Sequence, residues 1–299
     1  MSGLSRCTSG DLPIYSDTFL GIGSGKSKGI DARVVLVPVP YDSTVSYKSG
    51  TRNGPRAIIS ASQQLENYDL ELERNVSDVG IYTYQEIEPD VSGPLSMVER
   101  VETVTRSLLG NGRLIGILGG EHSVTTGAVK ALRRSYPNLT VLYLDAHADL
   151  RDEYMGTPWG HASVARRLYD MCGIVEIGVR SLSAEERCFI EKANVPVVFW
   201  PPRKRDPGEV AAFALKHLSG EVYISVDLDV LDPSVMSAVG TPEPGGMTWD
   251  EVIGLIRTVA EHRKIVGFDI TELSPGEGPE ACAFTAAKLT YKLIGYATA

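Results

Sequence analysis

Cysteine is scarce in this sequence, and long apolar runs are missing from it. Its four cysteines lie far apart and form no C-x-x-C pair, so we expect free thiols in a reducing compartment. No apolar run reaches the length of a membrane span, and the first residues lack the charged start and apolar core of a secretory signal. These absences predict a cytoplasmic protein that has no membrane partner.

An excess of basic residues is also absent. The chain has 29 Lys and Arg against 38 Asp and Glu, which gives a net charge of −9 at pH 7. This sign argues against nucleic acid or an anionic membrane as a partner. The 299 residues show no linker, repeat or low-complexity segment, and 43% of them are hydrophobic. We predict a flexible N-terminal arm at residues 1–30, rich in Ser and Gly, and a single domain at residues 31–299.

Apolar strands alternate with helical segments along this domain. Ser183 with Glu186, and Thr248 with Glu251, have the spacing of capping boxes at the start of two helices. The alternation predicts an α/β fold with a mostly parallel sheet and helices on both of its faces. A closed (β/α)₈ barrel is the alternative, because periodicity does not exclude it. The strands are expected at residues 33–37, 114–118, 139–144, 174–179, 195–200, 221–226 and 265–270.

Acidic and imidazole side chains follow one of these strands at every second position. Asp145, His147 and Asp149 come directly after the apolar run that ends at Leu144. Because side chains alternate between the faces of a strand, these three could converge on one side at its end. Two carboxylates this close repel each other unless a cation joins them, and open α/β sheets bind ligands at the carboxyl ends of their strands. Taken alone, the motif could also be a solvated acidic turn.

Two further strand ends supply residues of the same kind. Asp227 and Asp229 follow the strand at 221–226, and His122 follows two glycines at the end of the strand at 114–118. Together with the first motif they give four carboxylates and two imidazoles, which are too many for one ion. Carboxylate-rich mixed sites suit Mn²⁺, Mg²⁺ or Fe²⁺ better than a structural zinc. We therefore predict two metal ions roughly 3.5–4 Å apart that share bridging carboxylates.

Three more polar residues are candidates for the site. His161 starts a helix, where it could be a proton shuttle or simply cap the helix. Glu272 follows the last strand, where a carboxylate outside the metal ligands could bind a cationic substrate or could be a solvated loop acid. Thr241 lies in a Gly/Pro-rich loop after the Asp pair, for which plain turn chemistry is the alternative.

Four motifs in this order resemble the ureohydrolases, which are the arginase/agmatinase family. The motifs are Gly-Gly-Glu-His-Ser at 119–123, Asp-Ala-His-Ala-Asp at 145–149, Ser-Val-Asp-Leu-Asp-Val-Leu-Asp-Pro at 225–233 and Gly-Thr-Pro-Glu-Pro-Gly-Gly at 240–246. The resemblance covers nearly the whole chain from Val37. It implies an arginase-like three-layer α/β/α sandwich around a parallel eight-stranded sheet, with two Mn²⁺ ions at the strand ends. It also implies a homotrimer or a homohexamer.

The resemblance further implies a role for each candidate residue. The expected ligands of the first Mn²⁺ are His122, Asp145, Asp149 and Asp227. Those of the second are His147, Asp145, Asp227 and Asp229, with Asp145 and Asp227 as bridges. A hydroxide between the ions, oriented by Asp149, is expected to attack the guanidinium carbon, which gives urea and an amine. His161 resembles the proton shuttle for the departing amine, and Glu272 with Thr241 resembles the pair that grips the guanidinium nitrogens.

The favoured substrate of such an enzyme is agmatine, which gives putrescine and urea. The loop after the metal motif contains Asp152 and Glu153, and an acidic loop suits an amine tail better than an amino-acid head, although Arg151 argues the other way. Arginine, guanidinobutyrate and aminopropylagmatine are the alternatives within the family. A zinc deacetylase is a more distant alternative, which the lack of an adjacent His-His pair disfavours. A non-catalytic metal-binding subunit is another, although such a relative would be expected to have lost a ligand.

Overall fold

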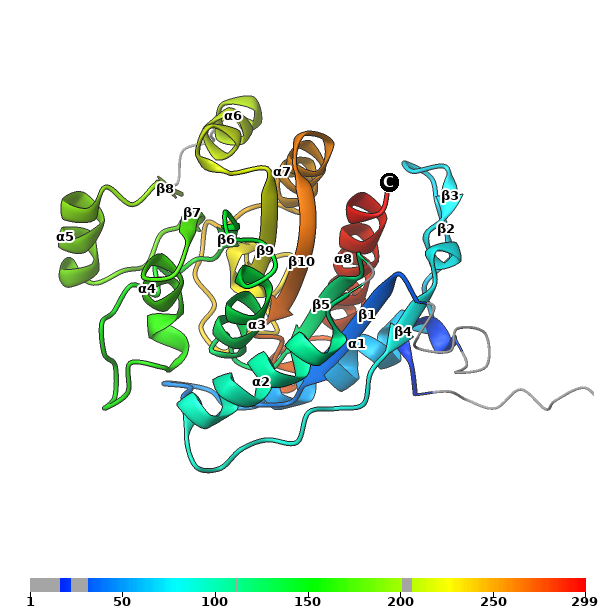
Figure 1. Ribbon diagram of the computed structural model, residues 1–299, viewed down its shortest axis with the longest axis horizontal. Coiled ribbons are helices and arrows are strands. Elements are labelled where there is room, and N and C mark those ends of the chain that lie inside the picture. Colours follow the sequence, from blue (N-terminus) through cyan, green and yellow to red (C-terminus); the bar gives the residue numbers. More distant parts are fainter. Residues whose placement is uncertain (1–16, 23–31, 111, 201–205) are drawn as a thin grey trace, which may run out of the picture.

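The computed structural model describes residues 17–22, 32–110, 112–200 and 206–299, which form a three-layer α/β/α sandwich (Figure 1). Its central sheet has eight strands, all parallel, in the order β4-β1-β5-β10-β9-β6-β7-β8. In the described part of the chain β4 and β8 are its two edges, so the sheet is open and the alternative of a closed barrel is wrong. The strands are β1 (Val34–Val39), β4 (Ile81–Thr83), β5 (Leu114–Gly119), β6 (Thr140–Leu144), β7 (Gly173–Val179), β8 (Val197–Phe199), β9 (Glu221–Asp227) and β10 (Lys264–Thr271).

Helices cover both faces of the sheet because its buried strands alternate their side chains between two apolar cores. In β1, Val34 and Leu36 belong to one core, whereas Val35 and Val37 belong to the other. The first core is covered by α1 (Gly54–Ser62), α6 (Pro207–His217), α7 (Trp249–His262) and α8 (Ala281–Ala297). The second is covered by α2 (Pro94–Leu108), α3 (Val124–Arg133), α4 (Val164–Tyr169) and α5 (Ala184–Ala193). The predicted parallel sheet with helices on both faces is therefore confirmed.

Two helices start as their sequence signals predict. The Ser183 hydroxyl accepts the backbone N–H of Glu186, whose carboxylate in turn accepts the N–H of Ser183 at the start of α5. Thr248 and Glu251 form the same reciprocal pair at the start of α7. Both predicted capping boxes are confirmed, and each provides partners for backbone N–H groups that a helix start leaves unpaired.

Some short elements lie outside the pattern of long apolar runs. β4 extends the sheet by three residues beside β1, and β2 (Tyr68–Asp69) and β3 (Arg74–Asn75) form a separate antiparallel hairpin. Of the predicted arm at residues 1–30, only 17–22 are described, and the rest lies outside the described residues. Phe19 is buried in the core beside α1, so this part of the chain is packed, which corrects the prediction of a flexible arm for it.

Two ion pairs, one of them buried, join the β2–β3 hairpin to α8. The Lys292 ammonium donates to the carboxylates of Asp69, at 2.8 Å, and Glu71, at 2.7 Å. Asp69 is 1% exposed, so Lys292 compensates a charge that has left water. Burial raises the pKa of Glu71, but hydrogen bonds from Lys292, Tyr296 and Arg257 outweigh this effect and lower the pKa to about 2. A Glu in an unfolded chain has a pKa of about 4.3. The ionised Glu71 therefore stabilises the fold above that pH, and its contribution is lost as the pH falls toward 2.

Lys292→Met is expected to lower the free energy of unfolding by about 3 kcal/mol at pH 7, because it leaves the buried carboxylate of Asp69 without its cation. Lys288→Met is the matched control. Lys288 lies 3.9 Å from Asp69 and its side chain is 30% exposed, so its loss should cost less than about 1 kcal/mol. Urea denaturation of both variants measures the difference. Equal losses would show that Asp69 does not depend on Lys292.

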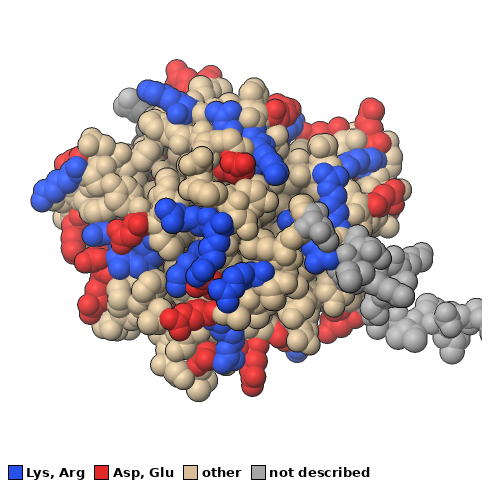
Figure 2. All heavy atoms as spheres, viewed as in Figure 1, with Lys and Arg blue, Asp and Glu red and all other residues tan. Residues whose placement is uncertain are grey.

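The surface carries charges of both signs. Figure 2 shows acidic and basic side chains intermingled over one face of the molecule. Between α2 and α3, for example, Glu102 pairs with Lys130 at 2.9 Å and with Arg134 at 2.8 Å. Within the described residues, no helix combines the length and the apolar character that crossing a bilayer requires. The cysteines found as free thiols, as expected, are Cys172, Cys188 and Cys282.

The centre of the sheet brings four strand ends together. β10 lies between β5 and β9, and β9 pairs on its other side with β6. Since the strands are parallel, their carboxyl ends lie at the same edge of the sheet. Residues that follow these four strands, although far apart in the sequence, therefore meet at one place.

Candidate metal centre

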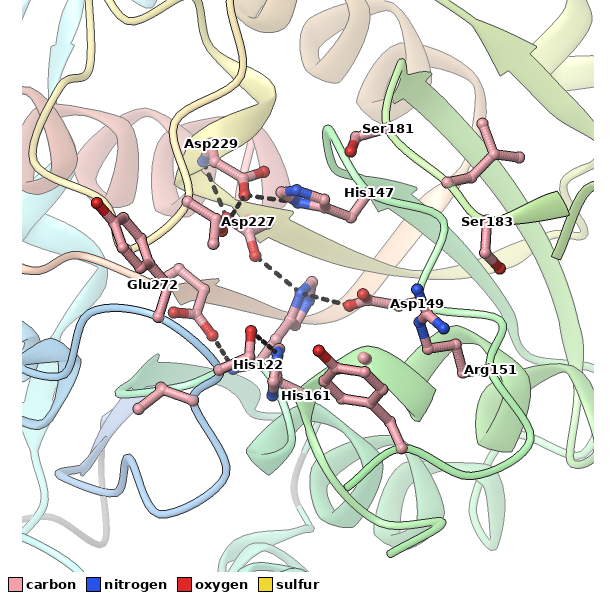
Figure 3. Close-up of a pocket in the computed structure, with 18 of the residues that line it drawn as sticks. His122, His147, Asp149, Arg151, His161, Ser181, Ser183, Asp227, Asp229 and Glu272 are labelled. Atoms are coloured by element: carbon pink, nitrogen blue, oxygen red, sulfur yellow. Dashed lines mark hydrogen bonds and ion pairs between the residues drawn. The ribbon is translucent and has the colours of Figure 1, made fainter. Parts of the chain in front are cut away.

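A cavity of about 270 Å³ opens where β5, β6, β9 and β10 end. Figure 3 shows the side chains that converge on it from these strand ends. The predicted site residues that line it are His122, His147, Asp149, His161, Asp227, Asp229, Thr241 and Glu272. Asp145 is fully buried and lies in contact with His122, so all six predicted ligands are brought together.

The first group of possible ligands surrounds His122. Its Nδ1 atom lies 3.1 Å from Asp145 Oδ2 and 3.1 Å from Asp227 Oδ2. Asp149 Oδ2 is slightly farther from the same nitrogen, at 3.7 Å. These atoms come from the ends of β5, β6 and β9, and they face one another across a space that a single ion could bridge.

The second group surrounds His147. Its Nδ1 atom lies 2.9 Å from Asp229 Oδ2 and 3.6 Å from Asp145 Oδ1. Asp145 thus belongs to both groups, with one carboxylate oxygen toward each histidine. This geometry supports Asp145 as a bridge. For Asp227, the other expected bridge, the second oxygen accepts the backbone N–H of Asp229 at 2.9 Å.

The chemistry of these groups fits divalent cations. Asp145 Oδ2 is buried and has no hydrogen-bond partner among the described residues, which would be costly without a cation. Burial raises the pKa of Asp149 well above its usual range, and the charge of Asp145 raises it further. Burial and the charges of Asp229 and Asp145 raise the pKa of Asp227 in the same way. Carboxylates that repel one another in this way, with two imidazoles beside them, favour Mn²⁺, Mg²⁺ or Fe²⁺.

Outer hydrogen bonds orient the first group. The Nε2 atom of His122 lies 2.8 Å from the Ser225 hydroxyl, which donates to Asp269 at 2.8 Å. The Tyr143 hydroxyl donates to Asp149 at 2.8 Å and also lies 3.0 Å from His122 Nδ1. A histidine whose far nitrogen is held in this way presents its other nitrogen in a fixed direction. Asp269 is fully buried on β10 as part of this support.

The backbone is held in uncommon conformations beside the site. Asp149 and Glu272 have positive φ values of 49° and 65°, which cost side-chain-bearing residues on the order of 1 kcal/mol each. Glu272 donates its N–H to the carbonyl of Gly120 at 2.8 Å. A Cβ on Gly120 would lie 2.0 Å from the carbonyl oxygen of Tyr41, so only glycine fits there. The backbone segments of Gly120 and Tyr41 therefore approach each other closely beside the site.

His161 lies at the cavity wall and is held by Thr44. The Thr44 hydroxyl accepts the backbone N–H of His161 at 3.0 Å and lies 3.2 Å from its Nδ1. It also donates to the buried carboxylate of Glu121 at 2.7 Å, so Nδ1 is the donor to Thr44 and Nε2 is the basic nitrogen. Burial lowers the pKa of His161 to about 4, which makes the ring neutral at pH 7. Nε2 lies 3.4 Å from the Ser46 hydroxyl at the cavity wall.

Glu272 and Thr241 both line the cavity, but no hydrogen bond joins them. Glu272 Oε1 accepts the backbone N–H of His122 at 2.7 Å. Within the described part of the chain its Oε2 atom has no hydrogen bond, so this oxygen is available to a ligand. The Thr241 hydroxyl instead lies 3.5 Å from Asp229 Oδ2.

Asp152 and Glu153 are not brought to the cavity. Asp152 is exposed and pairs with Arg167 at 2.5 Å, which draws its carboxylate toward α4. Glu153 is exposed and does not line the cavity either. From the same loop, Arg151 and Tyr154 are the lining residues, with the guanidinium 4.8 Å from the centre of the ring. This placement corrects the prediction that the two acids bind the tail of the substrate.

The polar support of the ligands was missed in the sequence, although part of it had a signal. Tyr143 precedes Asp145 by two positions and Ser225 precedes Asp227 by two, so each shares a strand face with a ligand. Each is a polar residue in an otherwise apolar buried strand, and this could have identified both residues as candidate supports of the ligands. Thr44 lies in a loop about 80 residues before its partner Glu121, and no local pattern connects them.

Comparison with known proteins gives one consistent result. A model of the arginase family matches residues 32–295. The chain is 37% identical over 275 residues to N(1)-aminopropylagmatine ureohydrolase of Synechocystis sp., covering 89% of each chain. It is 36% identical over 267 residues to agmatinase of Pyrococcus horikoshii, covering 89% of this chain and 92% of the relative.

A solved structure agrees with these relatives. The agmatine ureohydrolase of Thermoplasma volcanium superposes with a TM-score of 0.83 at 32% identity, and the match covers 96% of this chain and 95% of the other. The similarity therefore extends over the sheet, both helical layers and the strand ends that carry the candidate ligands.

Proposed function

The chain is a ureohydrolase of the arginase family, and from that premise we propose that it uses two Mn²⁺ ions to hydrolyse the guanidinium group of agmatine to urea and putrescine. The observation that carries the proposal is the pair of three-ligand groups that share Asp145 at the cavity. A single structural ion would need only one such group. Two adjacent groups at the end of an open cavity fit a hydrolytic pair.

We divide the proposed ligands between the two ions as the family resemblance implies. His122, Asp145, Asp149 and Asp227 would hold one ion. His147, Asp145, Asp227 and Asp229 would hold the other. When bound, such ions supply the Lewis acidity that makes water nucleophilic at neutral pH. The chain itself fixes the ligands through buried hydrogen bonds, so that the attacking water and the guanidinium meet in a set geometry.

Glu272 is the proposed partner of the guanidinium. One of its oxygens is held by the N–H of His122, and the other remains for the substrate. A guanidinium N–H bond to a carboxylate is charge-assisted and directional, so this contact would orient the carbon that is attacked. Thr241, which lines the same cavity, is proposed to donate or accept a further bond there.

His161 is the proposed proton carrier. Its neutral ring has a basic Nε2, and Thr44 fixes the orientation of the ring through Nδ1. Such a group can take a proton released in the reaction and pass it to the departing amine nitrogen. Asp149, whose Oδ2 is held by Tyr143, is proposed to orient the attacking water through its other oxygen.

The tail of the substrate is the finer part of the proposal. Figure 3 shows Arg151 and Ser183 across the cavity from Glu272, so the tail of a guanidine bound at Glu272 would extend toward them. The acid that lines this wall is Glu186, whose carboxylate accepts hydrogen bonds from Ser183 and from the N–H of Leu150. Agmatine is supported by the similarity to an agmatinase, and N(1)-aminopropylagmatine is a second candidate because of the similarity to the Synechocystis enzyme. Both guanidines carry an amine tail.

A panel of guanidines tests the substrate. The kcat/KM of urea release is expected to be higher for agmatine or N(1)-aminopropylagmatine than for arginine or guanidinobutyrate. The double variant Asp152→Asn/Glu153→Gln is expected to keep this preference, because neither acid lines the cavity. Faster turnover of arginine by the wild type would contradict the amine-tail proposal but not the release of urea. A reduced preference in the double variant would restore the two acids as substrate ligands.

Three accompanying expectations stay predictions. They are Mn²⁺ as the native metal, assembly into a homotrimer or homohexamer, and a cytoplasmic location. Metal analysis and light scattering of the purified protein would test the first two directly.

A further inference from the structure

One arginine beside the metal centre has an unusual set of partners. The Arg180 guanidinium follows β7 and donates to backbone carbonyls only: to Asp229 and Glu243 at 2.7 Å each, to Gly178 and Val230 at 3.2 Å, and to Leu231 at 3.4 Å. Within the described residues it forms no ion pair with a carboxylate. An arginine has five N–H donors in a rigid plane, so one side chain can tie together several chain segments that lack regular hydrogen bonds to each other.

Three of these carbonyls, those of Asp229, Val230 and Leu231, belong to the segment that carries one ligand of the second group. Asp229 is itself a proposed ligand, and its carboxylate Oδ1 accepts the N–H of Ala146 at 3.1 Å. The main chain of Arg180 donates to the carbonyl of Ala146 at 2.8 Å, next to His147. Arg180 therefore holds the segment of one ligand with its side chain and the segment of another with its backbone.

The same guanidinium also holds Glu243 in place. The Glu243 carboxylate lies 3.8 Å from the Nε2 atom of His147, on the side of the ring away from Asp229. A metal-binding histidine is commonly oriented by a carboxylate at its far nitrogen. For Glu243 to stay there, its loop must be anchored, and the two bonds from Arg180 to the Glu243 carbonyl, at 2.7 and 3.2 Å, anchor it.

Close packing surrounds the Arg180 guanidinium and the segment that it holds. A Cβ on Gly246 would lie 2.6 Å from the Nη2 atom of Arg180, and one on Gly178 would lie 2.5 Å from the side chain of Val230. The chain therefore has glycine at two positions where a larger residue would displace the guanidinium or the segment that it holds.

We infer that Arg180 is a positioning residue for the second metal ion, because it fixes Asp229 as a ligand and holds Glu243 against His147. This inference rests on the two-metal site of the proposed function. It concerns one of the two ions only, since the ligands that surround His122 are supported separately by Ser225 and Tyr143.

Titration of the metal-stripped full-length protein with Mn²⁺ tests the inference. Arg180→Met is expected to weaken binding at one of the two sites by about 10–100-fold and to leave the other nearly unchanged. Arg180→Lys, which keeps the charge but has fewer donors in another geometry, should fall between Arg180→Met and the wild type. Glu243→Gln, which removes the charge that lies 3.8 Å from His147 Nε2 but keeps the size of the side chain, should weaken the same site to a smaller extent.

Arg263→Met is the matched control. Arg263 also donates to three backbone carbonyls, those of Leu215, Leu218 and His262, but beyond the opposite ends of the strands. Its loss should leave both Mn²⁺ affinities as in the wild type, while circular dichroism and thermal melting report any general loss of structure. Wild-type protein that binds only one Mn²⁺ would contradict the proposed function itself.

Three outcomes would overturn the inferred role of Arg180 and leave the proposed function standing. One is a folded Arg180→Met protein with two wild-type affinities, and another is an equal loss at both sites. If Arg180→Met does not fold, Arg180→Lys and Glu243→Gln decide, and wild-type affinities in both of them are the third.

Discussion

Asp145→Asn is expected to abolish urea release and to remove both metal ions. The carboxylate directs Oδ2 toward His122, at 3.1 Å, and Oδ1 toward His147, at 3.6 Å. An asparagine keeps one oxygen, but its NH₂ group cannot coordinate a cation, so at least one ion would lose a ligand and both would lose the shared charge. Metal analysis after dialysis and an assay of urea release measure the two effects.

Two further variants make this result specific. Asp229→Asn is expected to lose chiefly the ion beside His147, since Asp229 belongs to that group alone. Asp170→Asn is the control, because this exposed carboxylate forms its ion pairs within the described residues with arginines of α4, and its loss should leave both ions and the activity unchanged. Active wild-type protein with one ion per chain would refute the two-metal site.

His161→Ala is expected to lower kcat by roughly 10²–10⁴-fold while both metal ions remain bound. This range is the usual contribution of a positioned acid or base. The ring lies at the cavity wall, outside both ligand groups, so its removal should affect proton transfer rather than metal binding. Steady-state kinetics with agmatine and metal analysis of the same sample separate the two.

His262→Ala is the matched control for this variant. That histidine is exposed on α7, where its Nδ1 lies 2.8 Å from the carbonyl of Thr258, far from the metal ligands in the sequence and in the fold. An unchanged kcat in His161→Ala would mean that His161 takes no part in proton transfer and only stabilises the start of its helix. A loss of metal would mean that the residue supports a ligand.

Much of the fold could be predicted because the strands are long, apolar and bounded by clear helix signals. β1, β5, β6, β7, β9 and β10 lie within one or two residues of the expected ranges. β4 could not be found in this way, since it has three residues and pairs only with β1. The order of the strands in the sheet could not be predicted from periodicity either, because apolar alternation indicates which faces are buried and not which strands are neighbours. The family resemblance supplied the eight strands, which the structure confirms.

The site was predictable where its residues follow strands and not where they lie in loops. The six ligands stand at strand ends, and their spacing of two residues follows from the geometry of a strand. The placement of Asp152 could not be derived, because the choice between a substrate and Arg167 depends on how α4 packs beside the loop. The support of His161 by Thr44 and Glu121 was hidden for a related reason, since it joins segments that meet only in the folded chain.

The position of β10 has a consequence for how the protein is made. It is the last of the eight strands of this sheet in sequence order, yet it pairs with both β5 and β9 in the middle of the sheet. Without it, the strands of the sheet fall into two groups that do not pair with each other, β4-β1-β5 and β9-β6-β7-β8, with His122 on one and His147 on the other. The metal pair therefore spans a seam that the segment from Lys264 onward must close. A nascent chain that stalls before Lys264 has five of its metal ligands on one half and the sixth on the other, with no strand between them.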